Sequence, residues 1–260
     1  MNARLIFLLW LGTAVCYATP RVEISTGEWP PWISAEMDGY GNGSQIVTQA
    51  FALEGYKTRF HFFGWTQAYQ RAKQGEFQAT FGWIYNKQRA QDFNYSQPVF
   101  RANYYWFYLK DNPKAPFDWD TLQNRQDLNI GITRSYWYGE EFDALKRKGR
   151  FQIKEASTNL VNFKRLLAGE IDLFPHNLCV GFYQLRHQFT EDMPLIAHSP
   201  SPLSVNDIHL IFNKVTPGNL ALLETFNRGM NKLRQQKSFK KTMNKCFRNW
   251  RLGQQRAVRQ

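Results

Sequence analysis

The 260-residue sequence is 43% hydrophobic and 16% aromatic, which suits one or two domains with a substantial core. Its mean hydropathy of −0.53, and the lack of a long uncharged apolar segment after the first residues, favour a soluble protein and argue against a membrane-embedded one. The net charge of +12 would be compatible with nucleic-acid binding. Most lysines and arginines are scattered, however, which favours a solvated basic surface attracted to an anionic membrane face.

The first eighteen residues have the three parts of an export signal. Residues 1–4 carry a positive charge, residues 5–15 are almost entirely apolar, and Cys16 and Ala18 place small side chains at the two positions that a signal peptidase reads. The apolar part is shorter than the roughly 20 residues that span a bilayer, which disfavours a membrane anchor. We therefore predict a cleaved signal peptide over residues 1–18 and a periplasmic protein, for which nucleic acid is not an expected partner.

Two cysteines remain after this leader, Cys179 and Cys246. A cysteine pair in an exported protein can form a disulfide. Sequence alone does not show whether their Cα atoms lie within bonding distance, so the pairing stays open.

The first ninety residues alternate between strand and helix patterns. Residues 21–26 alternate as a strand, and residues 27–32 interrupt it with two prolines. The pattern then predicts a helix over 44–53, a strand over 57–63, a helix over 65–73 and a strand over 77–83. This alternation is typical of a parallel sheet with right-handed crossovers.

A second series follows an aromatic strand over 103–110 and a polar connection over 111–116. The predicted elements are a strand over 128–132, a helix over 138–148, a strand over 151–154, a helix over 158–168, a strand over 171–174 and a helix over 178–186. A late strand over 207–213 then precedes helices over 219–233 and 238–247.

A chain that builds one α/β unit, then a second, and then returns predicts two lobes. We expect lobe I to comprise 19–108 and 209–247, and lobe II to comprise 109–208, joined by crossing strands 103–110 and 207–213. Residues 248–260 would form a flexible basic tail. Because ligands bind at the carboxyl ends of strands in such sheets, the two facing edges predict a cleft that a hinge can close.

Four segments resemble the periplasmic solute-binding proteins of family 3, whose best-known members serve polar amino acid importers. The segments are 26–32 (Thr-Gly-Glu-Trp-Pro-Pro-Trp), 82–99 (beginning Gly-Trp-Ile-Tyr-Asn-Lys-Gln-Arg), 130–136 (Ile-Gly-Ile-Thr-Arg-Ser-Tyr) and 169–177 (Gly-Glu-Ile-Asp-Leu-Phe-Pro-His-Asn). Their order covers nearly the whole chain after the leader. The resemblance implies the two-lobed type II periplasmic binding protein fold, a small-molecule ligand, an ABC permease as partner, no cofactor and a monomer.

The resemblance also implies a set of binding residues. Arg89 stands where the family holds a ligand carboxylate, and a guanidinium offers the planar fork that matches one. Trp29 stands at the family's aromatic lid, and Trp83, Tyr85 and Tyr136 are further aromatic candidates for the cleft. The remaining candidates for ligand contact are Glu28, Asn86 and Asn177.

The chain departs from the family pattern at the end of the site that would hold an α-amino group. Asn177 stands where the family usually has an aspartate that pairs with this group, and an amide supplies no negative charge. Ile84 replaces a usual hydroxyl residue. Either Glu28 restores the lost charge or the ligand lacks a free α-amino group, and the sequence leaves both open.

Two other functional classes are less favoured. The five histidines show no metal-ligand spacing, so we expect neither a metal site nor a cofactor. A periplasmic dehydratase on the same scaffold would need a tuned acid, for which Glu28, Asp172 and His176 are the candidates, but no residue pattern demands catalysis and we do not expect an enzyme. A sensor partner that presents its ligand to a membrane receptor remains an alternative to an importer, because both need a closing cleft.

Overall fold

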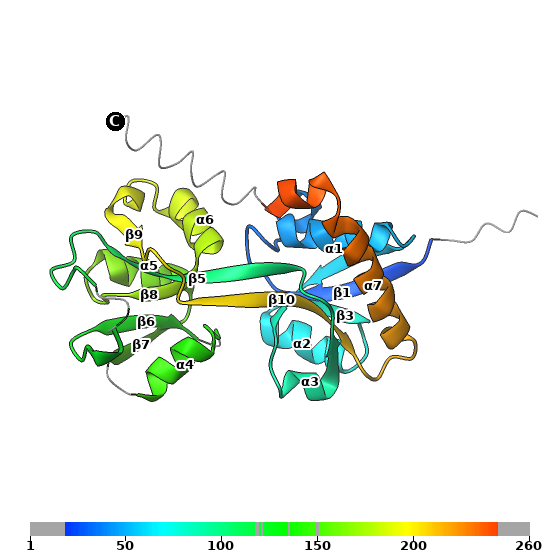
Figure 1. Cartoon of the computed structure of the whole chain (residues 1–260), viewed down its shortest axis with the longest axis horizontal. Coiled ribbons are helices and arrows are strands. Elements are labelled where there is room, and N and C mark those ends of the chain that lie inside the picture. The colour runs from blue at the N-terminus through cyan, green and yellow to red at the C-terminus, as the bar shows by residue number, and fades with distance from the viewer. Residues whose placement is uncertain (1–18, 118–119, 121, 135, 149–150, 244–260) are drawn as a thin grey trace, which may run out of the picture.

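The computed structural model describes residues 19–117, 120, 122–134, 136–148 and 151–243. They form two α/β lobes side by side, joined by two long strands (Figure 1). The predicted signal peptide (1–18), the basic tail (248–260) and Cys246 lie outside the described residues. Cys179 is disulfide-bonded.

The first lobe follows the predicted alternation of strands and helices. Its elements are β1 (Arg21–Thr26), α1 (Asn42–Ala52), β2 (Lys57–Phe62), α2 (Trp65–Lys73), β3 (Ala79–Ile84), α3 (Arg89–Asp92) and β4 (Phe93–Tyr95), with α7 (Asn219–Arg234) added from the end of the chain. Strand β1 pairs in parallel with β2 and β3, as the crossovers predict. Helix α1 buries Ile46, Val47, Ala50 and Phe51, the spacing on which its prediction rested.

The second lobe is built from β6 (Asn129–Thr133), α4 (Glu140–Arg147), β7 (Gln152–Ala156), α5 (Asn159–Leu167), β8 (Phe174–Asn177), α6 (Leu178–Gln188) and β9 (Ile196–His198). Short 3-10 helices lie at Asp38–Tyr40, Leu122–Asn124 and Met193–Leu195. Strands β6 and β7 pair in parallel. A strand predicted over 171–174 lies three residues later in the structure, because Leu173 only bridges Ile130 whereas 174–177 pair with β5.

Two strands, β5 (Phe100–Leu109) and β10 (Ser204–Asn213), connect the lobes. Within the described residues, the main sheet has the order β2-β1-β3-β10-β5-β8, with β4 beside β10 and β9 beside β5. Residues 204–208 of β10 pair with β5, and residues 208–212 pair with β3 of the first lobe. The structure thus confirms the two-lobed α/β fold with two crossing strands, while the residue limits set for each lobe stay a prediction.

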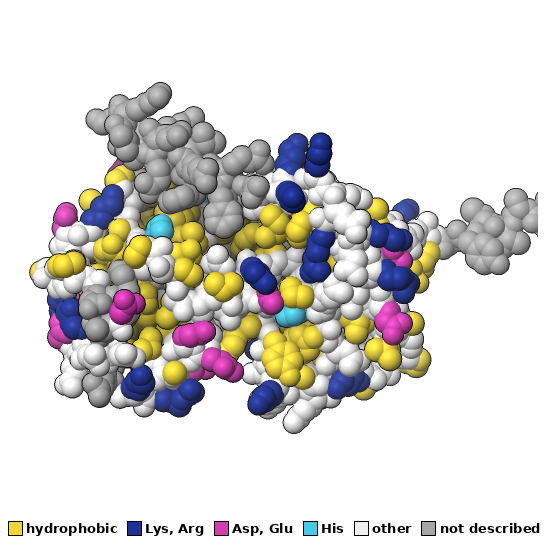
Figure 2. All heavy atoms as spheres, viewed as in Figure 1, with side chains coloured by type: hydrophobic (Ala, Val, Ile, Leu, Met, Phe, Trp, Pro, Cys, Tyr) yellow, Lys and Arg dark blue, Asp and Glu magenta, His cyan; other side chains and the backbone are white. Residues whose placement is uncertain are grey.

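The last predicted helix, 238–247, is described only in part, and residues 237–243 are helical. Among the helices of the described residues, none is long and apolar enough to cross a bilayer. Lysine and arginine side chains on the face drawn in Figure 2 form separate small groups, with aspartate and glutamate between them.

Candidate ligand-binding cleft

A cavity of about 420 Å³ lies between the lobes. This volume falls in the range of small-molecule sites. Its lining comes from the loop after β1, the start of α2, the ends of β3 and β6, the starts of α3 and α5, and the two crossing strands. The lining residues are Trp29, Trp65, Gly82, Trp83, Ile84, Arg89, Tyr104, Thr133, Arg134, Tyr136, Trp137, Ser157, Thr158, Asn159, Leu160, Gln184 and Ile208. Strand carboxyl ends therefore frame the cavity, as α/β sheets predict.

Tryptophan side chains form the wall of the first lobe. Trp65 and Trp83 meet edge to face, with ring centroids 5.4 Å apart. Gly82 has φ +101°, and a Cβ there would lie 2.8 Å from the ring of Trp65. The glycine therefore lets the Trp65 ring pack across the strand and reach the cavity.

Arg89 begins α3 at the edge of this wall and is half-buried. Its Nη1 donates to the carbonyl oxygen of Ile84 at 3.0 Å, and its Cζ lies 4.8 Å from the centroid of the Trp83 ring. In the described part of the chain, no carboxylate forms an ion pair with Arg89. The guanidinium is thus held in place by neutral groups and keeps its charge for a ligand.

The second lobe contributes a chain of hydrogen bonds that ends at Tyr136. Asn162 Nδ2 donates to Thr133 Oγ1 at 3.0 Å, and Thr133 Oγ1 donates to Asn159 Oδ1 at 2.7 Å. Asn159 Nδ2 then donates to the hydroxyl oxygen of Tyr136 at 3.2 Å. Burial raises the pKa of Tyr136 more than this last bond lowers it, so the side chain stays a neutral phenol.

A second buried pair orients Gln184. Nε2 of His176 lies 3.1 Å from Gln184 Oε1, while His176 Nδ1 is buried without a hydrogen-bond partner among the described residues. Because an amide oxygen only accepts, Nε2 carries the hydrogen. Burial lowers the pKa of His176 to about 3, so the ring is neutral.

The structure brings four of the eight predicted binding residues to the cavity, namely Trp29, Trp83, Arg89 and Tyr136. The sequence interpretation did not include Trp65, Asn159 or Gln184, which also line it. Position offers a signal for Asn159, since a helix that begins at the carboxyl end of a strand faces the site. Trp65 and Gln184 carry no comparable signal in the sequence.

The other four predicted residues do not line this cavity. Glu28 is exposed, and its Oε1 accepts from the backbone N–H of Ala35 at 2.9 Å. Tyr85 is 52% exposed and packs on Tyr95. Whether Glu28 and Tyr85 reach a bound ligand after closure stays a prediction.

Both asparagines of that set accept backbone hydrogen bonds just before or at the start of a helix. Asn86 Oδ1 accepts from the backbone N–H of Arg89 at 3.1 Å. Asn177 Oδ1 caps α6 through the N–H of Val180 at 3.1 Å and also accepts from Trp32 Nε1 at 3.4 Å. Their side-chain oxygens are therefore engaged in this conformation.

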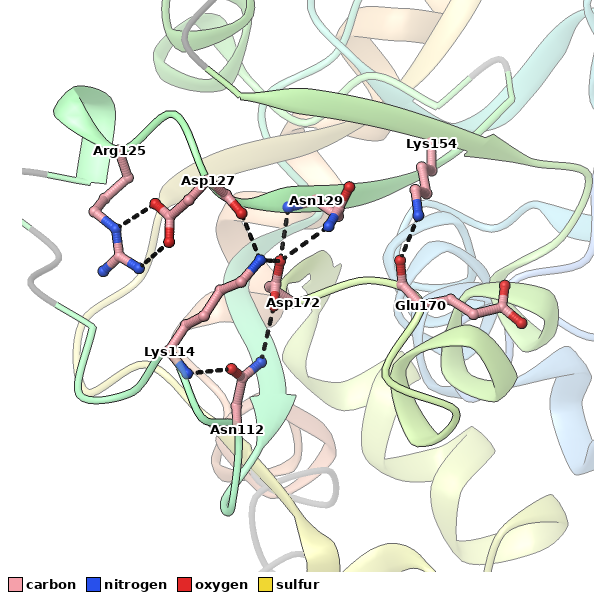
Figure 3. A network of polar contacts seen from close by, with 8 residues as sticks. All are labelled: Asn112, Lys114, Arg125, Asp127, Asn129, Lys154, Glu170 and Asp172. Carbon is pink, nitrogen blue, oxygen red and sulfur yellow. Dashed lines mark hydrogen bonds and ion pairs between the residues drawn. The ribbon is translucent and has the colours of Figure 1, made fainter.

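The acid candidates for catalysis lie outside the cavity lining as well. Asp172 joins three segments of the second lobe by accepting from the backbone N–H of Asn129, from Lys114 Nζ and from Asn112 Nδ2, at 2.7, 2.8 and 3.3 Å (Figure 3). Burial by itself raises the pKa of Asp172, but these donors outweigh it and leave the pKa below its usual range. No cluster of three potential metal-ligating His, Cys, Asp or Glu side chains occurs in the described ranges.

Comparison with known proteins gives one family. The model of the bacterial extracellular solute-binding proteins, family 3, matches residues 24–249. No curated protein sequence matches the chain.

Solved structures with the same fold come from several functional settings. A histidine kinase sensor domain similar to periplasmic binding proteins has a TM-score of 0.69 and 17% identity over 87% of this chain and 96% of that chain. The binding component of an ABC transporter from Wolinella succinogenes, complexed with lysine, has a TM-score of 0.70 and 14% identity over 87% and 95%. An ancestral amino acid-binding protein, a precursor of cyclohexadienyl dehydratase, has a TM-score of 0.66 and 17% identity over 87% and 95%. At these identities the likeness shows the fold alone.

Proposed function

Since the chain belongs to the bacterial extracellular solute-binding proteins, family 3, we propose that it captures a small amino acid or related carboxylate in the periplasm and delivers it to an ABC-type importer. The observation that carries the proposal is Arg89, a half-buried guanidinium without an acidic partner among the described residues, at the edge of an aromatic cavity. A guanidinium in such a place binds a carboxylate through two parallel hydrogen bonds.

Closure of the cleft is the proposed mechanism. The cavity takes Arg89 and Trp29 from one lobe and Tyr136 and Gln184 from the other, so a ligand that contacts both lobes binds the closed form more tightly. Ligand binding would then shift the population toward a closed shape that docks on the permease. Strands β5 and β10 are the elements that would bend.

A thermal-shift screen of the protein without residues 1–18 tests this function. The screen would cover amino acids, amino-acid derivatives and small carboxylates, and a ligand that binds only the native state raises the melting temperature. We expect at least one hit, and small-angle scattering of the protein with that hit should show a smaller radius of gyration. A screen without any hit, also after extension to sugars, polyamines and peptides, would refute the binding function.

A ligand-presenting sensor is the second candidate, and the likeness to a histidine kinase sensor domain favours it. The two candidates differ in the partner of the closed form. Neighbouring permease and ATPase genes, and ligand uptake that is lost when the gene is deleted, would support transport. A kinase gene beside this one, with uptake unchanged on deletion, would support sensing.

We propose a binding rather than a catalytic role. None of the three acid candidates lines the cavity: Glu28 is exposed, Asp172 accepts hydrogen bonds within a structural network, and His176 is fully buried. One structural neighbour is a precursor of a dehydratase, so catalysis on this scaffold is the alternative to test. Product analysis by mass spectrometry after incubation with each hit should return the unchanged ligand.

A further inference from the structure

Arg89, Tyr136 and Gln184 present hydrogen-bond donors to the cavity, and its lining contains hydroxyl groups but no carboxylate in the described residues. This bears on the ligand class within the function proposed above. In the chain that ends at Tyr136, each side-chain oxygen already accepts one hydrogen bond from its neighbour in the chain. Asn159 Oδ1 accepts from Thr133, and Thr133 Oγ1 accepts from Asn162. Since the Tyr136 oxygen accepts from Asn159 Nδ2, its own hydrogen remains for a ligand.

Gln184 also presents a hydrogen-bond donor to the cavity, because of its contact with His176. Its Oε1 is taken by Nε2–H of the buried His176, so its NH₂ group is the part left for the cavity. His176 cannot offer a proton switch here, because the ring is fully buried and stacks on Phe174 with centroids 4.9 Å apart. Two independent networks thus turn donors toward the same space.

Carboxylates are missing from the cavity lining in the described residues. The two charged side chains that line it are both arginines, Arg89 and Arg134. Arg134 is paired with Glu155 through a 2.7 Å contact and its side chain is 70% exposed, so Arg89 supplies the unpaired charge. An ammonium group placed here would find no carboxylate as counter-charge in the described lining, and burying an unpaired charge is costly.

We infer that the ligand is a carboxylic acid without an ammonium group, with an apolar or aromatic body. Arg89 and the Tyr136 hydroxyl hold its carboxylate, and the rings of Trp29, Trp65 and Trp83 contact its body. This class rests on the proposed function. Asn177 left two alternatives, that Glu28 restores the missing negative charge or that the ligand lacks an α-amino group. Because Glu28 does not line the cavity, the inference favours the second.

Matched ligand pairs that differ only in the ammonium group test the class. Calorimetric titrations would compare 3-phenylpropanoate with L-phenylalanine, and 4-methylpentanoate with L-leucine. We expect at least one acid to bind about tenfold or more tightly than its amino acid, because the ammonium loses its hydration without gaining a partner.

A variant of Tyr136 tests the geometry. Tyr136→Phe removes the hydroxyl that the hydrogen-bond chain orients, so the affinity for the acid should fall by about tenfold or more. The matched control is Tyr40→Phe, whose ring is 41% exposed and does not line the cavity. Wild-type affinity in Tyr136→Phe, with the melting temperature unchanged, would overturn the assignment of this donor.

The remaining outcomes separate this inference from the function on which it rests. If an amino acid binds as tightly as its matched acid, the class is wrong and the solute-binding function stands. If no acid binds while a sugar, polyamine or peptide does, the class is again wrong and the function stands. If nothing binds, the solute-binding function itself fails.

Discussion

Replacing Arg89 by glutamine removes the one cavity charge that no described carboxylate neutralises. Glutamine keeps a donor and much of the length of the side chain, so the change tests charge and fork geometry more than volume. In the structure Nη1 of the guanidinium donates to the carbonyl oxygen of Ile84, and the group lies on the ring of Trp83 and beside the side chain of Tyr95. These contacts leave its remaining N–H groups for a ligand.

The expected loss of affinity follows from the bonds that a carboxylate would form. Hydrogen bonds to a charged group contribute about 1.5–3 kcal/mol each and are not additive, so a bidentate contact is worth about 2–4 kcal/mol. This corresponds to an affinity that is about 30- to 1000-fold weaker. The fold should survive, since the lost bond to Ile84 and the ring contact with Trp83 together stabilise it by about 1–2 kcal/mol.

Titration calorimetry with 3-phenylpropanoate, or with the tightest acid of the matched panel, measures the change. Intrinsic fluorescence gives a second readout, because Trp29, Trp65, Trp83 and Trp137 all line the cavity. The control is Arg101→Gln, an arginine 75% exposed and paired with Asp207 away from the cavity. An Arg89→Gln protein that is folded and binds the acid within threefold of wild type would refute the role of this residue.

Three further predictions concern stability. Asp172→Asn should lower the free energy of unfolding by about 2–3 kcal/mol in urea melts, because a buried carboxylate with four donors is lost, and an unchanged midpoint would contradict this. His176 is neutral when folded and protonates below pH 6.5 when unfolded, so the wild type should lose about 1.4 kcal/mol per pH unit between pH 6 and 4. His176→Gln should lack this component, and equal pH slopes would argue against it. Gly82→Ala should cost about 1–3 kcal/mol and alter tryptophan fluorescence by displacing Trp65. Gly64→Ala has open space at its Cβ but replaces the N-cap of α2, so it should cost about 1 kcal/mol or less and leave the fluorescence unchanged.

The fold was largely readable from the sequence because its signals are local. Helix α2 begins and ends at the predicted residues, and the helical spacing of Ile46, Val47, Ala50 and Phe51 marks the buried face of α1. The predicted strands are wrong or missing where pairing with a strand far away in the sequence determines the position of the strand. The strand near residue 174 is placed by its partner β5, and the short strand β4 owes its pairing to β10, which lies more than a hundred residues later.

The site was only partly readable, for a different reason. Asn86 and Asn177 matched family positions, yet each precedes a helix, and asparagine before a helix is a capping signal that the sequence itself displays. Gln184 could not be found this way. Its role depends on His176, eight residues earlier, being buried among aromatic rings, which is a consequence of tertiary packing.

The division of chemistry between the lobes has a consequence for selectivity. Lobe I supplies the unpaired charge of Arg89, which attracts any carboxylate, amino acids included, whereas lobe II supplies neutral donors whose orientation is fixed by buried partners. Loss of Arg89 should therefore weaken the binding of acids and of amino acids to a similar extent. Loss of the lobe II donors should weaken the binding of acids more than the binding of amino acids. The ratio of the two affinities within each matched pair should therefore become smaller. Discrimination against the ammonium group would then arise only on closure, when a ligand held by Arg89 meets a described surface without a carboxylate to pair with the ammonium.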